Sequence, residues 1–337
     1  MSAGDRLRAT AATLGVAAAG GGAVLGWGVG VGLRSFRLRR VTVPVLAPGT
    51  PAVRVLHLSD LHLLPRQDRK RAFVHALDRL DPHLVVNTGD NIADRDAVPA
   101  LLDTLGPLLR RPGCFVFGSN DFTAPQPRNP AGYLFPSLAG DHGEQVEDLP
   151  FGQVREAFTA AGWLDLDNHA GTLNLTDADL GPGGLAVAVA GTGDAHIDRD
   201  ELASIPDAPT GQPALAITHA PYRRVLDRFV EHGWPLILAG HTHGGQLRIP
   251  GYGAIVSNCD LPPAQAAGLS RWPAGTARGG YLHVSAGLGT SPWAPVRIAC
   301  PPEASLLTLV PAVPTMVPAV PTMAGETWPT TTKAERR

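Results

Sequence analysis

The sequence has little cysteine and no excess of either charge. Its three cysteines, Cys114, Cys259 and Cys300, lie far apart in the 337 residues, so neither a disulfide framework nor a zinc–thiolate site is indicated. The 28 basic and 30 acidic side chains leave a formal net charge of −2, which argues against a surface built for nucleic acid. We therefore expect no nucleic-acid partner, and the twelve histidines become the main supply of metal-binding side chains.

Charge is also absent from one continuous stretch near the start, from Ala9 to Leu33. The stretch is long enough to cross a bilayer as a helix, so we predict that residues 1–35 form an N-terminal membrane anchor or signal-anchor. Four arginines follow the stretch and favour a membrane-associated protein with a cytoplasmic catalytic domain: Arg34, Arg37, Arg39 and Arg40. The alternative is that they belong to a first strand predicted at 36–45 and carry no topology signal. A cleaved signal peptide and a soluble apolar segment are the open alternatives.

The other end of the chain has few residues that build a core. The seven residues from Val310 to Met316 are repeated in Val317 to Met323, with two prolines in each copy. Proline at this density supports neither a helix nor a sheet ladder. Residues 311–337 are therefore predicted to be a Pro-rich disordered tail, which leaves 36–310 as the folded domain.

Within that domain, short apolar runs alternate with segments of helical spacing. Strands are predicted at 53–58, 84–88, 115–117, 185–190, 214–218 and 236–239, and helices at 66–80, 98–109, 151–161 and 222–231. Strands at 281–285 and 306–310 complete the pattern, and 122–150 is predicted to be a long surface loop. Alternating strands and helices indicate an α/β fold with parallel strands, in which ligands bind beyond the carboxyl ends of the strands.

Polar side chains follow these strand ends repeatedly. Gly240-His-Thr-His-Gly-Gly-Gln246 places two histidines directly after a buried strand, where both imidazoles can face one cleft. The whole set collected from the strand ends is Asp60, His62, Asp90, Asn120, His219, His241 and His243. Oxygen and imidazole donors without thiolate suit Mn, Fe, Zn or Mg, and manganese is among the ions we expect. Seven ligands exceed the need of one tetrahedral ion and are about right for two divalent ions.

These motifs resemble those of the calcineurin-like metallophosphoesterases. The resemblance lies in Asp60-Leu-His62, Gly89-Asp90, Gly118-Ser-Asn-Asp121, His219 and Gly240-His-Thr-His243, and it covers roughly 53–310. The frames around Asp60 and His241 are most similar to a bacterial membrane-associated branch with UDP-2,3-diacylglucosamine hydrolase-like and phosphodiesterase-like members. The resemblance implies a four-layer α/β/β/α sandwich for 36–310.

The resemblance also implies roles for the seven residues. Asp60, His62 and His243 would hold the first metal, and Asp90 would bridge both ions. Asn120, His219 and His241 would complete the second site. Only a carboxylate offers two anionic oxygens for two dications about 3.5–4 Å apart, so a carboxylate suits the bridging position.

The third motif departs from the usual Gly-Asn-His-Asp/Glu. Aligned without a gap, Ser119 takes the metal position and Asn120 the position of the catalytic histidine. Shifted by one residue, Asn120 is the ligand and Asp121 lies nearest the catalytic position. We favour Asn120 as ligand and assign Asn120 and Asp121 as the catalytic candidates. His196 or His142 could replace the missing histidine, and the alternative for each is an ordinary loop histidine. His57, inside a strand, is expected to pack in the core or to support the site rather than to bind metal, and Asp194 either orients a metal-binding histidine or ends a turn.

The sequence thus predicts a metal-dependent phosphoester hydrolase with a two-metal centre and a bridging water. A phosphodiester or a lipid-linked pyrophosphate is the expected substrate, and the N-terminal helix is the expected membrane contact. The alternative is a membrane-tethered metal-binding or regulatory module with little or no turnover, which the missing histidine suggests.

Overall fold

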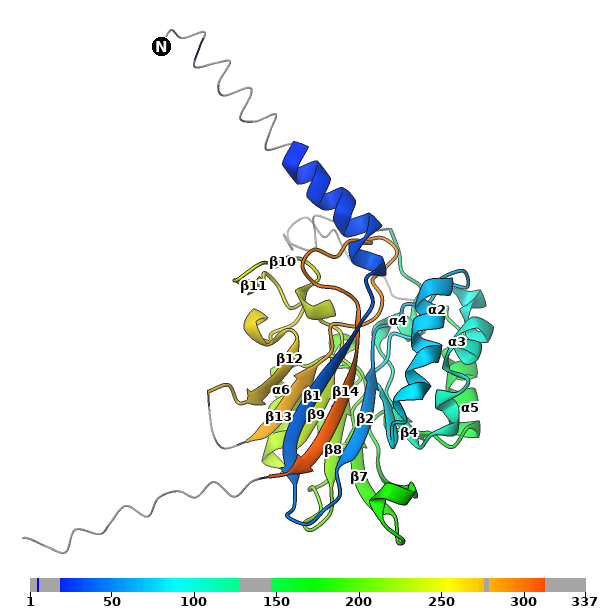
Figure 1. Ribbon diagram of the computed structural model, residues 1–337, viewed down its shortest axis with the longest axis vertical. Helices are drawn as coiled ribbons and strands as arrows, with labels where there is room; N and C mark the ends of the chain where they lie inside the picture. The colour runs from blue at the N-terminus through cyan, green and yellow to red at the C-terminus, as the bar shows by residue number, and fades with distance from the viewer. Residues whose placement is uncertain (1–4, 6–18, 128–146, 276–278, 313–337) are drawn as a thin grey trace, which may run out of the picture.

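The computed structural model describes residues 5, 19–127, 147–275 and 279–312. At the amino end, residues 19–30 form a helix that projects from the body of the molecule (Figure 1). A short 3₁₀ helix, η1 (Gly32–Arg34), joins it to the first strand. In the part of the chain so described, no helix combines the length and the hydrophobicity that a bilayer crossing requires. Residues 9–18 of the predicted membrane segment lie outside the described residues, so the membrane helix stays a prediction.

The first of two large sheets contains the early strands of the domain. Its six strands lie in the order β1-β14-β2-β3-β4-β5. Their bounds are β1 Arg37–Leu46, β14 Glu303–Pro311, β2 Val53–Leu58, β3 Leu84–Asn87, β4 Gly113–Phe115 and β5 Leu164–Asp165. The strands from β2 to β5 run parallel, whereas β14 is antiparallel to β2 and parallel to β1. The carboxyl ends of β2, β3 and β4 therefore meet at one edge.

The second sheet contains the later strands, in the order β12-β13-β9-β8-β7-β6. Their bounds are β12 Gly268–Trp272, β13 Gly280–Val284, β9 Leu236–Ala239, β8 Ala214–Thr218, β7 Leu185–Gly191 and β6 Ala170–Leu175. Only the two edge strands, β12 and β6, are antiparallel to their neighbours. A separate two-stranded hairpin, β10 (Arg248–Ile249) with β11 (Gly253–Ala254), follows the loop after β9.

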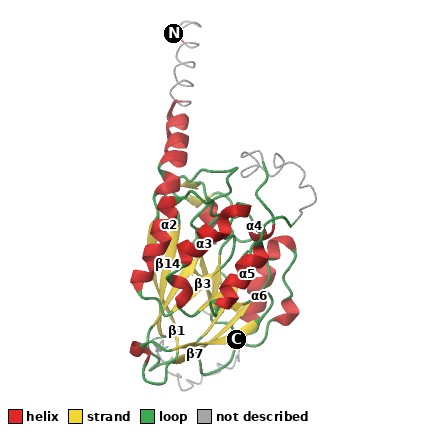
Figure 2. Ribbon diagram, turned by 90° about the vertical axis from the view of Figure 1, so that its right-hand side faces the viewer, coloured by secondary structure: helices red, strands yellow, loops and turns green. Residues whose placement is uncertain are grey.

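Helices cover the outer face of each sheet (Figures 1 and 2). The α-helices are α2 Asp68–His75, α3 Val98–Leu105, α4 Ser119–Phe122, α5 Phe151–Ala160 and α6 Arg223–Glu231. The further 3₁₀ helices are η2 Ala76–Leu80, η3 Arg95–Ala97, η4 Leu108–Arg110, η7 Ala178–Leu180, η8 Ala195–Ile197, η9 Leu202–Ser204, η10 His243–Gly245 and η11 Pro263–Gln265.

Three apolar clusters show how these layers pack. One cluster joins inward-facing residues of both sheets, such as Val55 of β2 and Leu238 of β9. A second cluster packs α2, α3 and α5 on the first sheet, and a third packs α6 on the second sheet. The layers therefore follow the α/β/β/α order that the resemblance implies, although both sheets are mixed rather than purely parallel.

Several predicted boundaries differ from the observed ones for local reasons. The helix predicted at 98–109 is interrupted at Gly106-Pro107, because proline has no N–H to donate, and it continues only as η4. The helix predicted at 66–80 begins at Asp68 and changes to the 3₁₀ helix η2 after His75. The strand predicted at 115–117 is paired two residues earlier, as β4. Residues 128–146 of the predicted long loop and nearly all of the tail lie outside the described residues.

Candidate metal centre

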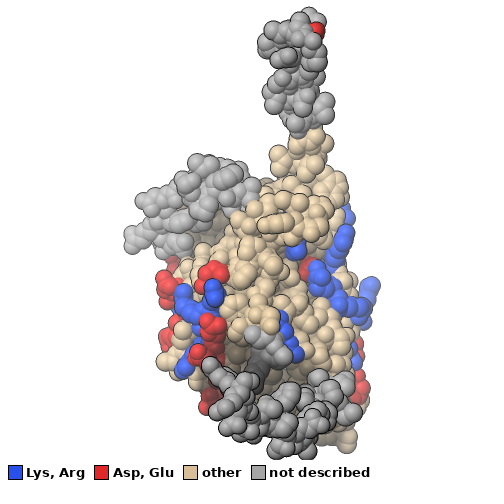
Figure 3. Space-filling model, turned by 90° about the vertical axis from the view of Figure 1, so that its left-hand side faces the viewer, with Lys and Arg blue, Asp and Glu red and all other residues tan. Residues whose placement is uncertain are grey.

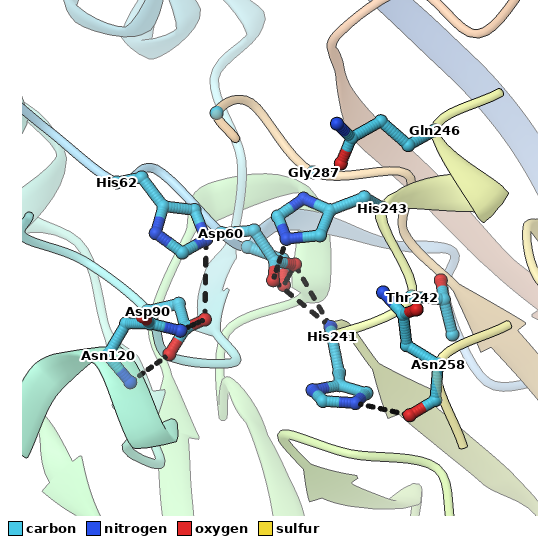
Figure 4. A network of polar contacts seen from close by, with 12 residues as sticks. Asp60, His62, Asp90, Asn120, His241, Thr242, His243, Gln246, Asn258 and Gly287 are labelled. Atoms are coloured by element: carbon cyan, nitrogen blue, oxygen red, sulfur yellow. Dashed lines mark hydrogen bonds and ion pairs between the residues drawn. The ribbon is translucent and has the colours of Figure 1, made fainter. Parts of the chain in front are cut away.

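The predicted ligands that follow the strands come together at one edge of the two sheets. Two groups of side chains place their ligand atoms within 4.8 Å of one another: Asp60 with His62 and His243, and Asp60 with Asp90 and His219. Figure 4 shows Asp60 in the middle of the site, with Asp90 and Asn120 on one side of it and His241 and His243 on the other. Residues from several strand ends, separated by up to 183 positions (60 to 243), thus form two adjoining groups.

Both carboxylates stand between the two groups. Asp60 belongs to both, and Asp90 Oδ2 lies 3.3 Å from His62 Nε2 and 3.6 Å from His219 Nε2. The sequence predicted only Asp90 at a bridging position, so the shared position of Asp60 is an addition from the structure. Burial raises the pKa of Asp90 to about 6, despite the opposing effect of His219. A bound cation would favour the charged form of both carboxylates.

Four imidazole nitrogens in the site are buried without a hydrogen-bond partner among the described residues. They are His62 Nδ1, His62 Nε2, His219 Nε2 and His243 Nδ1. Burial lowers the pKa of His62 and His243 well below the usual value, so both imidazoles are neutral and free to bind a metal. Buried nitrogens without a hydrogen bond, beside two carboxylates, are costly unless a ligand satisfies them, and they fit divalent cations.

His219 is held in one orientation. Its Nδ1 donates to the carbonyl oxygen of Thr88 at 2.7 Å, which leaves Nε2 for an ion. Burial alone would lower the pKa of His219, but the carboxylates of Asp90, Asp194 and Asp60 raise it to about 10. Without a metal, His219 therefore carries the proton that a cation would displace.

The other two predicted ligands lie beside the second group rather than in it. The His241 ring lies 5.3 Å from the His219 ring, and its Nε2 donates to the carbonyl oxygen of Asn258 at 3.2 Å, which leaves Nδ1 free. Asn120 donates its side-chain amide to Asp90 Oδ2 at 2.8 Å and its backbone N–H to Oδ1 at 2.9 Å. Both residues thus lie within the site, where Asn120 holds the Asp90 carboxylate and His241 contacts the loop at Asn258.

The backbone at this edge is unusual. Five of the seven predicted ligands have positive φ angles, between 40° and 68°: Asp60, His62, Asp90, His241 and His243. A left-handed conformation costs a non-glycine residue about 1–2 kcal/mol, so packing and hydrogen bonds must impose it. Conformational strain concentrated on the ligand residues is consistent with a functional site.

Glycines allow the ligand loops to approach one another. A Cβ atom on Gly118 would clash with Asp90 Oδ1 and would lie 2.5 Å from His219 Cε1. A Cβ on Gly287, in the loop after β13, would lie 2.6 Å from the Asp60 Cβ. These positions need glycine because any side chain would displace a ligand.

Asp121, one of the two predicted catalytic residues, is fully buried beneath the site. Its carboxylate accepts backbone N–H groups of Asp90 (2.7 Å), Asn91 (2.7 Å) and Gly118 (3.0 Å). Burial and the negative charge of Asp90 raise the pKa of Asp121 to about 7, against the effect of these hydrogen bonds. The geometry therefore gives Asp121 a positioning role toward the Asp90 loop.

A buried chain of hydrogen bonds supports Asp60 from behind. Ser59 donates to Asp60 Oδ2 at 2.5 Å and accepts from Thr88 Oγ1 at 2.7 Å. His57 Nε2 lies 2.9 Å from Thr88 Oγ1, and His57 Nδ1 lies 3.1 Å from Nδ1 of His283 on the second sheet. This buried, hydrogen-bonded position agrees with the core or supporting role predicted for His57, whereas the roles of Thr88 and His283 were missed.

Arg297 is a supporting residue that no motif or periodicity in the sequence indicates. Its guanidinium is fully buried and donates to the carbonyl oxygens of Ala286 (2.7 Å), Gly289 (2.6 Å) and Cys300 (3.3 Å). The backbone N–H of Gly289 in turn donates to the carbonyl oxygen of Asp60. Arg297 thus fixes the loop that packs against the first ligand.

The remaining candidates lie around the rim of the site. Asp194 accepts the backbone N–H groups of Ser119 (2.8 Å) and His196 (2.9 Å), which makes it a loop anchor. His196 is exposed, its ring lies 4.6 Å from the ring of His241, and its Nδ1 lies 3.1 Å from the Tyr222 hydroxyl. Ser119 is half-buried, and His142 lies outside the described residues.

The chain is similar to known phosphoesterases in sequence. The model of the family described as calcineurin-like phosphoesterase matches residues 53–245, more than half of the chain. An uncharacterised metallophosphoesterase of Aquifex aeolicus (strain VF5) is 25% identical over 292 residues, covering 81% of this chain and 92% of the relative. Phosphodiesterase YaeI of Escherichia coli (strain K12) is 28% identical over 171 residues, covering 51% and 56%. The solved structure of TT1561 of Thermus thermophilus aligns with a TM-score of 0.37 at 12% identity, over 71% of this chain and 90% of that one.

Proposed function

The chain belongs to the calcineurin-like phosphoesterase family and is therefore a metal-dependent phosphoester hydrolase, and we propose that it cleaves a phosphodiester at a centre of two divalent ions. The observation that carries the proposal is the pair of adjoining Asp/His groups that share Asp60, with imidazole nitrogens in both that lack a hydrogen bond. The similarity to phosphodiesterase YaeI supports a diester over a monoester.

We assign the residues as follows. Asp60, His62 and His243 would hold the first ion, and Asp90 would serve both ions. His219 would hold the second ion, with His241 through Nδ1 and Asn120 through its side-chain oxygen. The distances from Asp90 Oδ2 to His62 and His219 support the bridging position. Asp60 is the alternative bridge, because it belongs to both groups.

The bound ions supply positive charge that offsets the charge developing on a phosphoryl group and lowers the pKa of water. The protein's own part is to hold the site rigid before substrate arrives. The N–H of His241, at 3.1 Å from both Asp60 oxygens, and Ser59 fix the Asp60 carboxylate. The Thr88 carbonyl fixes the tautomer of His219. At the third motif, Asn120 can donate its side-chain amide to a phosphoryl oxygen, in place of the usual histidine.

We also propose that the apolar run from Ala9 to Leu33 attaches the enzyme to a membrane, with the catalytic domain on the cytoplasmic side. An enzyme attached in this way could act on a lipid-linked phosphodiester or pyrophosphate in the membrane. The uncharged sequence and Arg34 directly after it support this attachment, whereas Arg37, Arg39 and Arg40 belong to β1, where Arg39 pairs with Glu303.

The test is hydrolysis of bis-p-nitrophenyl phosphate by full-length protein that has been stripped of metal and reloaded with Mn²⁺. We expect activity to vanish on stripping and to return on loading. Asp90→Asn should remove most of the activity, whereas the control Asp103→Asn, on the exposed face of α3, should retain it. Folded, metal-loaded protein without activity toward this diester, phosphomonoesters or pyrophosphates would reject the hydrolase and favour a metal-binding module.

A further inference from the structure

Large apolar side chains are exposed on one end of the molecule. In the described part of the chain, the nine exposed large hydrophobic residues lie on only three segments: the helix 19–30 with its last turn, the β10–β11 hairpin, and the loop at Trp293. The nine are Val24, Leu25, Trp27, Val29, Val31, Ile249, Tyr252, Ile255 and Trp293. Tyr252 is the most exposed, at 77%. We call this set the apolar rim.

The three segments of the apolar rim are joined to one another. The Arg297 N–H donates to the carbonyl oxygen of Gly28 in the helix, where a Cβ would lie 3.0 Å from the Ile298 side chain. Ile298 in turn pairs with the hairpin, because its carbonyl oxygen accepts the N–H of Arg248 at 3.0 Å. Figure 1 shows the helix, β10 and β11 at the same end of the molecule. The helix, the segment around Arg297 and the hairpin are therefore in direct contact.

This surface lies beside the metal centre. The hairpin packs on the loop after His243 so closely that a Cβ on Gly245 would clash with the Ala254 Cβ. Gln246 donates to the carbonyl oxygen of Ala294 at 2.6 Å, which ties the same loop to the segment that follows Trp293. The hairpin and the Trp293 segment thus both contact the loop that carries His243.

The chemistry of the rim selects one kind of partner. The segments 19–36, 246–258 and 291–299 contain no Asp or Glu, and their charged residues are Arg34, Arg248 and the buried Arg297. Tryptophan and tyrosine among aliphatic residues are typical of the membrane–water interface, and arginine suits anionic headgroups. Figure 3 shows a surface without charged side chains below the helix, with mainly basic side chains on one side of it and a mixed group of acidic and basic side chains on the other. Ahead of the helix, the sequence continues without charge from residue 9 to residue 18.

We propose that the apolar rim rests on a membrane surface that contains anionic lipids, so that the metal centre faces the lipid headgroups. The inference rests on the proposed function, because a phosphoester hydrolase so placed acts on phosphoesters in the headgroup layer. The hairpin and Trp293 add a second contact to that of the N-terminal segment, and this second contact fixes the orientation of the domain.

The test places an environment-sensitive fluorophore on the hairpin of the full-length protein. Tyr252→Cys is labelled in a Cys259→Ser background, since Cys114 and Cys300 are buried. The control label is at Arg110→Cys, which is exposed before the amino end of β4. With phosphatidylcholine vesicles that contain phosphatidylglycerol, we expect a blue shift and quenching by brominated lipid at position 252 and neither change at position 110.

A second measurement uses the unlabelled chain. Ile249→Ser with Tyr252→Ser should lower the vesicle partition coefficient by about tenfold, from the loss of buried apolar surface. Arg79→Ser with Arg110→Ser should leave the coefficient unchanged. Hydrolysis of soluble bis-p-nitrophenyl phosphate is followed in the same samples and should be unaffected by either pair, which separates a failure of docking from a failure of the enzyme.

Three results would overturn the inference. One is protein that binds vesicles while position 252 stays in water. Another is the absence of vesicle binding. The third is a dimer in sedimentation equilibrium that buries position 252 without lipid, since the rim would then be an interface between copies of the chain.

Discussion

Replacement of Asp121 by Asn should destabilise the protein because the carboxylate is surrounded by donors. Oδ2 accepts the N–H groups of Asp90 and Gly118, and Oδ1 accepts the N–H of Asn91. An asparagine has only one oxygen, so its NH₂ group must face at least one buried backbone N–H. Above pH 7, where the Asp121 carboxyl is ionised, this loses one charge-assisted hydrogen bond and leaves a donor unpaired, at a combined cost of about 3 kcal/mol.

The second effect of Asp121→Asn concerns the metal. Asp90 has a φ of 55°, and the hydrogen bond from its N–H to Asp121 helps to impose that conformation. When this bond is weakened, Asp90 leaves its position between the two groups, and we expect the affinity for Mn²⁺ to fall by about 10–100-fold. Because the substitution acts through Asp90, excess Mn²⁺ should restore most of kcat.

The assays are urea unfolding with and without Mn²⁺, a Mn²⁺ titration, and hydrolysis of bis-p-nitrophenyl phosphate at saturating metal. Asp103→Asn is the control, because Asp103 is exposed and its ion pair with Arg71 contributes at most about 1 kcal/mol. An Asp121→Asn variant with unchanged stability and Mn²⁺ affinity, but with kcat reduced by orders of magnitude, would refute the positioning role. Asp121 would then act on the substrate, as the sequence led us to expect.

Three further perturbations test other parts of the site. Gly118→Ala should lower kcat about 100-fold in a folded protein, because the new Cβ displaces Asp90 and His219. The control is Gly152→Ala on α5, which has open space around it. Normal turnover by Gly118→Ala would show that the loop can shift freely. Arg297→Met should destabilise the protein by about 3 kcal/mol, since several carbonyl oxygens lose their donor. Arg110→Met is the control, and an unchanged urea midpoint of Arg297→Met would contradict the role of Arg297 in fixing the loop. Binding of Mn²⁺ at pH 7 should release about one proton from His219, whose pKa is raised to about 10, so that the apparent affinity rises with pH. Calorimetry in buffers of different ionisation enthalpy measures this release, and a heat that does not depend on the buffer would contradict it.

The sequence predicted the centre of the fold well because the inner strands are continuous apolar runs. The strands at 53–58, 214–218 and 236–239 have the observed bounds, and each is buried along almost its whole length. The edge strands of the second sheet were missed for the opposite reason. In β6 (Ala170–Leu175) buried and exposed residues alternate, and β12 is mostly half-buried, so neither forms an apolar run.

The ligands could be predicted because each follows a strand, and parallel strands bring their carboxyl ends together. The sequence could not predict which carboxylate belongs to both ligand groups. The membership of Asp60 in both groups depends on the approach of Gly240 and Gly287, from two other loops, to its side chain. Arg297 lies in a proline-rich segment without periodicity, and its acceptors become visible only when the chain is folded.

Anomalous scattering from crystals of the full-length protein grown with Mn²⁺ tests the central claim most directly. Our assignment predicts two strong peaks, one among Asp60, His62 and His243 and the other beside His219, with Asp90 or Asp60 between them. A single peak, or manganese bound only away from these residues in a protein that still hydrolyses the diester, would contradict it.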